Sequence, residues 1–190
     1  MRKGILVAGL LIFPVLLLIL GCAGEPTNEL AAAKDALEKA RAAEADKYAP
    51  DLFTQAGSSI TEAENLIAQK KYGEAKKRLM DAKGVAESAA SQAEINKENT
   101  KTEVEDFFAA IDQAVKQLKE TQDLAKQWGI PKKKRALTEE MSGWDEQLKK
   151  AHAEYDSGNY YSAKELAAGI HQEVTTKDNE LREMIMAKQK

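Results

Sequence analysis

The chain has 190 residues, of which 43% are apolar, 31% are charged and only 6% are aromatic. Abundant Ala, Glu, Lys and Leu with few β-branched residues is the composition of long helices. The formal net charge of −3 makes nucleic acid a poor partner, because binding it needs many Lys and Arg side chains to neutralise phosphates. We therefore expect an all-α protein that does not bind nucleic acid.

The first 21 residues have the layout of a signal peptide. Arg2 and Lys3 form a short positive segment, and residues 5–20 are apolar or small, interrupted only by Pro14. A membrane span needs about 20 apolar residues, so this run is short for a transmembrane helix but fits the apolar segment of a signal peptide. Residues 1–21 are thus predicted to be removed on export.

The signal peptide ends at Ile19-Leu20-Gly21-Cys22, which contains the only cysteine of the chain. This tetrapeptide resembles the lipobox of bacterial lipoproteins, in which an aliphatic residue and then a small residue precede an invariant cysteine. The resemblance implies cleavage between Gly21 and Cys22, a diacylglycerol thioether on Cys22 and an acylated new N-terminus. Two or more acyl chains attach a protein to a membrane almost permanently, at about 0.8 kcal/mol per buried CH₂ group.

Three alternatives compete with lipidation: an uncleaved signal anchor, a chance match in an ordinary signal peptide, and a free thiol. A free thiol would be a liability in an oxidising compartment. Residue 23 is Ala rather than Asp, which resembles lipoproteins sorted to the outer membrane, facing the periplasm. Residues 22–28, which include Gly24 and Pro26, are expected to form a short flexible tether.

Residues 29–97 are predicted to form a first unit of three helices. Apolar residues recur there at alternating steps of three and four, the spacing of one helix face. Tyr48-Ala49-Pro50 is expected to interrupt the first helix, and the polar stretch 69–71 predicts a corner near Gly73. We call the apolar face of each predicted helix its seam. The three seams are Leu30, Ala33, Leu37 and Ala40; then Phe53, Ala56, Ile60, Ala63 and Ile67; then Tyr72, Ala75, Leu79, Ala82, Ala86, Ala89 and Ala93.

Residues 98–190 are predicted to form a second unit of the same design. Its first helix is expected to stop at Gly129 and Pro131, and 156–159 is a strong turn signal between the other two. Trp144 lies on a predicted seam and should be a core residue. The seams are Val104, Phe108, Ile111, Val115, Leu118 and Ala125; then Met141, Trp144, Leu148, Ala151 and Tyr155; then Tyr160, Ala163, Ala167, Ile170, Val174 and Leu181.

The two units are related by a shift along the chain. A shift of 88 residues carries the seams of the second and third helices onto those of the fifth and sixth, including Tyr72 onto Tyr160. For the first helix the shift is 81, which places Pro50 on Pro131. The difference of seven residues is expected to lengthen the fifth helix by two turns. We interpret the chain as a tandem repeat.

The join between the units has two interpretations. No glycine or proline occurs between Gly84 and Gly129, so the third and fourth helices could be one long central helix. The seam phase slips between Ala93 and Val104, however, and Thr102 begins a capping-box pattern. We expect a break or bend near residues 96–102. The fold class is all-α, with two tandem antiparallel three-helix units and heptad-like, coiled-coil seams.

The first unit resembles a known helical domain. Its motif residues are Tyr48-Ala49-Pro50-Asp51-Leu52, Ala56, Ala63, Tyr72, Ala75 and Ala82. They are similar to a small uncharacterised domain of Gram-negative envelope lipoproteins, over about residues 29–93. The motif consists mostly of packing residues, and the resemblance implies no catalytic or binding residue.

No constellation of residues predicts catalysis. His152 and His171 are the only histidines, they fall on different helices, and no cysteine could join them at a zinc site. We interpret them as helix-surface residues. The many carboxylates alternate with lysines on polar faces, which is typical of solvated helices. We predict no catalytic residue, no metal ligand and no cofactor.

Two features are candidates for binding. Lys132, Lys133, Lys134 and Arg135 form a cationic run after Pro131, either a solvated helix start or a contact for an anionic surface such as peptidoglycan or lipid head groups. Trp128 and Tyr161 fall off the seams beside turns, where they either pack at corners or form a partner patch.

These features predict an envelope lipoprotein that acts as a non-catalytic interaction or structural module. Its partners would be the membrane, through the lipid on Cys22, and an envelope protein. The second hypothesis is a peptidoglycan- or ligand-binding accessory protein that uses the basic run at 132–135 and the two corner aromatics.

Overall fold

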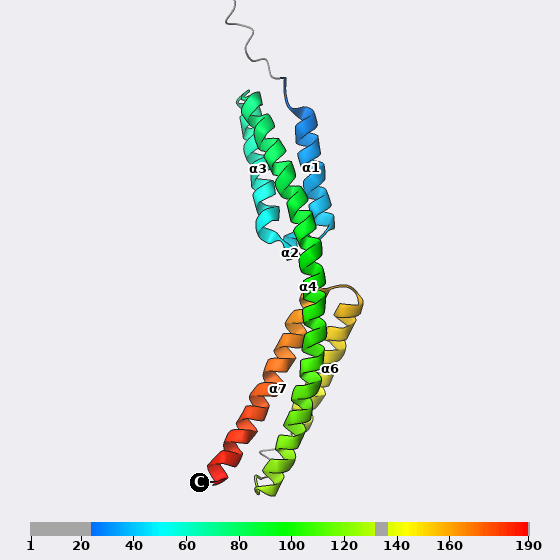
Figure 1. The fold of residues 1–190 in the computed structure, drawn as a ribbon, viewed down its shortest axis with the longest axis vertical. Helices are drawn as coiled ribbons and strands as arrows, with labels where there is room; N and C mark the ends of the chain where they lie inside the picture. The colour runs from blue at the N-terminus through cyan, green and yellow to red at the C-terminus, as the bar shows by residue number, and fades with distance from the viewer. Residues whose placement is uncertain (1–23, 132–136, 190) are drawn as a thin grey trace, which may run out of the picture. The chain divides into compact units, whose positions relative to one another are not determined.

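The computed structural model describes residues 24–131 and 137–189, and this part of the chain is all-α, as predicted (Figure 1). Its helices are α1 (Thr27–Ala42), α2 (Ala45–Tyr48), α3 (Pro50–Ala68), α4 (Tyr72–Gln127), α6 (Thr138–Asp156) and α7 (Tyr160–Gln189). The chain divides into two compact units, unit 1 up to Ser91 and unit 2 from Gln92. Helix α4 contributes to both.

Unit 1 has a core built mainly of alanine. Helices α1, α3 and the first part of α4 each turn a stripe of small residues inward, and small side chains let helix axes approach closely. Leu79 of α4 is its largest fully buried residue. The core residues are Ala33, Ile60, Ala63, Leu79 and Ala82 in one cluster and Ala36, Ala56 and Ala86 in another.

The first helix ends earlier than the predicted break at Tyr48-Ala49-Pro50. Helix α1 stops at Ala42, and Glu44 takes a left-handed conformation with φ of 58°. The short α2 follows, and Pro50 then occupies the first turn of α3. Proline suits this position, because the first N–H groups of a helix need no intrahelical partner and the ring sets a helical φ.

The corner between α3 and α4 lies at Lys70, three residues before the predicted site at Gly73. Lys70 has φ of 61°, whereas Gly73 lies inside α4. Lys71 N–H donates to the Leu66 carbonyl at 2.9 Å and Lys70 N–H to the Ile67 carbonyl at 2.8 Å. This is a Schellman cap, which normally has glycine at the left-handed position because other residues pay about 1 kcal/mol there.

The corner between α6 and α7 repeats this cap 88 residues later. Gly158 has φ of 80°, and its N–H donates to the Tyr155 carbonyl at 2.9 Å. Asn159 N–H donates to the Glu154 carbonyl, also at 2.9 Å. Each of these residues corresponds, under the shift of 88, to its partner in the α3–α4 corner. The two corners therefore have the same hydrogen bonds with different side chains.

The expected break near residues 96–102 is wrong, and the alternative of a long central helix is confirmed. Helix α4 continues through this stretch, where Thr100 and Thr102 donate their hydroxyls to the carbonyls of Asn96 and Glu98, at 2.7 and 3.2 Å. Thr102 is thus a helix-interior residue rather than a cap. The 11-residue step from Ala93 to Val104 equals three turns at about 3.67 residues per turn, so the phase slip needs no break.

The expected lengthening of the fifth helix is also wrong. Helices α3 and α6 both have 19 residues, and their first residues, Pro50 and Thr138, are related by the shift of 88. The seven extra residues of unit 2 therefore precede α6 instead of extending it. Pro131, predicted to match Pro50 as a helix break, is the first of these seven residues and lies seven positions before the start of α6.

Unit 2 has a core of larger side chains, contributed by α4, α6 and α7 and by Ile130 and Leu137, which lie between α4 and α6. Trp144 is 7% exposed, as expected for a seam residue. Asp178 also lies in the buried stripe of α7; its Oδ2 accepts a hydrogen bond from Arg182 Nε at 2.6 Å, but Oδ1 has no partner among the described residues. The core residues are Ile111, Ala114, Leu118, Ala125, Ile130, Leu137, Trp144, Ala167, Ile170, Val174, Leu181 and Ile185.

Candidate functional site

The predicted lipidation site lies outside the described residues. Gly21 and Cys22 precede Gly24, where the description begins. The backbone is hydrogen bonded almost from this point: Thr27 N–H donates to the Glu25 carbonyl at 2.9 Å. Helix α1 begins at Thr27, two residues before the start assumed for the first unit. In the part that the structure describes, no helix is long and apolar enough to cross a membrane.

The predicted binding residues do not form one site. The run Lys132, Lys133, Lys134 and Arg135 lies outside the described residues. Trp128 and Tyr161 are 42% and 50% exposed, but they occupy opposite ends of unit 2. Trp128 follows α4 beside the last turn of α7, where Lys188 Nζ lies 3.4 Å from the Gly129 carbonyl. Tyr161 is in the first turn of α7, about 40 Å away along that helix.

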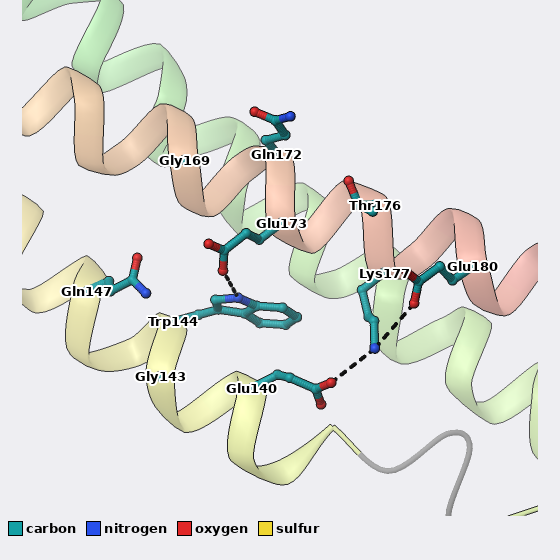
Figure 2. A pocket seen from close by; sticks show the side chains of 10 residues that line it. All are labelled: Glu140, Gly143, Trp144, Gln147, Gly169, Gln172, Glu173, Thr176, Lys177 and Glu180. Carbon is teal, nitrogen blue, oxygen red and sulfur yellow. Dashed lines mark hydrogen bonds and ion pairs between the residues drawn. The ribbon is translucent and has the colours of Figure 1, made fainter.

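An open groove runs between α6 and α7 in unit 2 (Figure 2). Trp144 lies along it, and Gly143 and Gly169 face it from the two helices. A Cβ atom added to either glycine would meet no atom within 4 Å. The lining residues are Glu140, Gly143, Trp144, Gln147, Gly169, Gln172, Glu173, Thr176, Lys177 and Glu180.

The polar groups of this groove bind one another. The Trp144 indole N–H donates to Glu173 Oε2 at 2.8 Å (Figure 2). Lys177 Nζ lies 3.0 Å from Glu140 Oε1 and 3.3 Å from Glu180 Oε2. The hydrogen bond to Glu140 is the largest cause that raises the pKa of Lys177, and it outweighs the desolvation that would lower this pKa. The Trp144–Glu173 hydrogen bond and the Lys177–Glu140 ion pair each join α6 to α7, so both stabilise the contact between these helices.

Sequence reasoning missed the groove, although the repeat carried a signal for it. Under the shift of 88, Trp144 replaces Ala56, and Glu173 and Lys177 replace Val85 and Ala89 of unit 1. A bulky ring and two charged residues thus appear together at positions where unit 1 has small or apolar side chains. These three differences between the repeats, taken together, would have indicated that the face between α6 and α7 is particular to unit 2.

The two histidines lie against neighbouring phenylalanines of α4. The rings of His152 and Phe108 have centroids 4.0 Å apart, and those of His171 and Phe107 are 6.1 Å apart. His152 is exposed, and His171 is half-buried. Their contacts are packing contacts within unit 2. Among the described residues, no group of three His, Cys, Asp or Glu side chains is placed to hold a metal ion.

One family of known proteins matches part of the chain. The model of DUF4398, a domain of unknown function, matches residues 28–106, which include unit 1 and the first residues of unit 2. The expected resemblance to an uncharacterised domain is therefore confirmed, while the lipoprotein part of that expectation stays a prediction. No curated protein and no solved structure gives a significant match.

Proposed function

With a DUF4398 domain at residues 28–106 as the premise, we propose that the protein is an envelope lipoprotein whose helical units act as a non-catalytic interaction or structural module. The observation that carries the proposal is the lipobox Ile19-Leu20-Gly21-Cys22 at the end of a signal-peptide pattern. Two or more acyl chains on Cys22 would attach the protein to the membrane. Ala23 favours the outer membrane, with the protein facing the periplasm.

The chemistry of the described residues supports a role in binding rather than catalysis. In the α6–α7 groove, the carboxylates of Glu140, Glu173 and Glu180 are engaged by Lys177 or by the indole of Trp144. Catalysis by a nucleophile or a general base instead needs a side chain that is within reach of a substrate and can react with it. Helix faces of the kind found in both units suit contact with another envelope protein.

The proposed architecture is a tandem repeat of one antiparallel three-helix unit. The two Schellman caps at Lys70 and Gly158 support it, since both backbone hydrogen bonds of the first recur 88 residues later. The equal lengths of α3 and α6 support it as well. In this view, unit 2 is a second copy of the bundle, and one of its faces has since changed. Trp144 now occupies the position that corresponds to Ala56 of unit 1.

The first test is the intact mass of the protein extracted from membranes, beside a Cys22→Ala variant. We expect a mass equal to residues 22–190 plus acyl chains, and the loss of both cleavage and membrane attachment in the variant. A chain that starts at Met1, or a cleaved chain without acyl mass, would refute the lipoprotein assignment.

A second candidate function is peptidoglycan binding, favoured by the exposed indole of Trp128, which lies four residues before the start of the basic run at Lys132. The test is a pull-down with purified peptidoglycan. Binding that is lost on alanine replacement of Lys132, Lys133, Lys134 and Arg135, and kept in Tyr161→Ala at the other end of unit 2, would support it. Absence of binding by the native chain would leave an envelope protein as the partner.

A further inference from the structure

Three exposed lysines lie at one end of unit 1. Lys70 and Lys71 form the α3–α4 corner, and Lys77 follows in the second turn of α4. None of the three has an ion pair within the part of the chain that the structure describes. We call this group the lysine corner.

The lysine corner lies at the end of unit 1 where α1 begins (Figure 1). Glu29 in the first turn of α1 forms an ion pair with Lys76 in α4, with Oε1 2.6 Å from Nζ. Leu30 and Ile67 pack on the same core cluster from α1 and from the end of α3. The chain therefore enters unit 1 beside the corner.

Only a few residues separate the proposed anchor, Cys22, from this end of unit 1. The first backbone hydrogen bond of the described chain involves the Glu25 carbonyl. Cys22 is three residues earlier, a path of at most about 11 Å for a fully extended chain. This length is close to the screening distance of about 8 Å at physiological salt. An anchor at Cys22 would therefore hold this end of unit 1, which carries the lysine corner, next to the lipid head groups.

From this geometry we propose that the lysine corner contacts anionic phospholipid head groups, as an electrostatic attachment beside the acyl chains. The proposal rests on the lipid anchor of the proposed function. Lysines next to a membrane are attracted to anionic lipids and favour contact with them. Tyr72, half-buried at the same corner, is of the residue type enriched at membrane–water interfaces.

The matching corner of unit 2 shows that the turn does not need lysines. Gly158 and Asn159 take the places of Lys70 and Lys71 and make the same backbone hydrogen bonds. Glu165 takes the place of Lys77. Glycine is also the residue that suits the left-handed position, whereas Lys70 is strained there. The lysines thus add positive charge to the corner that the anchor would hold near the membrane, against local backbone preference.

Acidic residues at this end limit the attraction. Glu29, Glu62 and Glu64 are paired with Lys76, Arg78 and Lys34. The exposed Glu25 and Glu74 oppose the three lysines of the corner. The excess positive charge is therefore small, and the contact should weaken as salt screens it.

The test uses the full lipidated chain in vesicles of phosphatidylethanolamine with either phosphatidylglycerol or phosphatidylcholine. The rate of amine acylation is measured at each lysine by mass spectrometry. We expect Lys70, Lys71 and Lys77 to react about fivefold more slowly on the phosphatidylglycerol vesicles, and high salt to remove the difference. Lys47, at the other end of unit 1, is the internal control and should react equally on both.

The double variant Lys70→Gly/Lys71→Asn gives unit 1 the corner of unit 2. It should keep or raise the melting temperature, while Lys77 loses its protection on phosphatidylglycerol vesicles. Equal rates on both vesicles in the native chain, equal protection of Lys47, or unchanged protection of Lys77 in the variant would each overturn the proposal. A chain without acyl mass overturns the lipoprotein assignment as well, whereas a lipidated, vesicle-bound chain with unprotected lysines overturns only this contact.

Discussion

Individual side chains set how closely the helices of each unit pack. Ala56 in α3 of unit 1 is fully buried, and its counterpart in α6 of unit 2 is Trp144. An indole needs more space than a methyl group, and its N–H needs a partner when it is buried. Glu173 supplies that partner from α7. A single residue type thus changes both the packing of two helices and the polar groups between them.

Replacement of Trp144 by alanine should destabilise unit 2 by about 3–5 kcal/mol, because it removes a large core side chain and leaves a cavity. Chemical denaturation followed by circular dichroism measures the loss. Trp144→Phe, which keeps most of the volume but loses the bond to Glu173, should cost less. An unchanged melting temperature in Trp144→Ala would contradict the assignment of this ring to the core.

Asp178 is a carboxylate in a buried stripe. Replacement by leucine should stabilise the protein by about 1–3 kcal/mol, because it removes a buried oxygen that has no hydrogen-bond partner among the described residues. The released Arg182 is half exposed and can be solvated. Thermal unfolding measures the change, with Asp178→Asn as the control that keeps the polar oxygen. A lower melting temperature in the leucine variant would show that the carboxylate is needed.

The phenol of Tyr155 should lose its proton at a higher pH than an ordinary tyrosine. Its hydrogen bond to Glu105 is the main cause that raises its pKa to about 12 from a reference of 10.0. Between these values the unfolded chain loses this proton first, so the contribution of the group to stability is full below pH 10 and is lost as the pH rises through 12. Ultraviolet titration of the phenol checks the value, and Glu105→Gln should lower it.

At the scale of elements, the ends of the helices follow local chemistry, with Pro50 at the start of α3 and Gly158 at the end of α6. The continuity of α4 does not follow from any single signal. Residues 96–102 are polar and a capping-box pattern begins at Thr102, but Glu and Lys are good helix formers and no glycine or proline interrupts the stretch. Packing of α4 against other helices on both sides of this stretch then favours one continuous helix.

A proline at Asn99 tests this continuity. In a helix interior, Asn99→Pro should cost about 3 kcal/mol or more, because it removes a backbone hydrogen bond and clashes with the preceding turn. Asn99→Ala, at the same exposed position, should be neutral or slightly stabilising. Denaturant unfolding compares the two variants. Equal stabilities would indicate that this stretch is not helical in solution.

At the scale of the whole molecule, two buried cores are joined by one helix that contributes to both. Leu79 of α4 belongs to the core of unit 1, and Ile111 of α4 belongs to that of unit 2. Among the described residues of these two clusters, Leu30 comes first in the chain. The proposed anchor thus precedes every described core residue.

A chain that starts at Gly24 should therefore fold like the full protein. We expect the same helical content by circular dichroism and the same melting temperature as for the lipidated chain in detergent. The control is a chain that starts at Ala33, which loses the first six residues of α1, including Leu30, and should melt lower. A lower melting temperature for the Gly24 chain itself would show that Cys22, Ala23 and the attached lipid add to the stability of the bundle.

The sequence by itself determined the all-α class, most of the buried seams and the turn at Gly158, because side-chain periodicity and turn residues act over a few positions. It also indicated the repeat, which the equal caps at Lys70 and Gly158 support. Only the tertiary structure decided that α4 is continuous, that Trp128 and Tyr161 are far apart, and that a groove lies beside Trp144. These features depend on which helix faces meet, and that depends on packing between residues far apart in the chain.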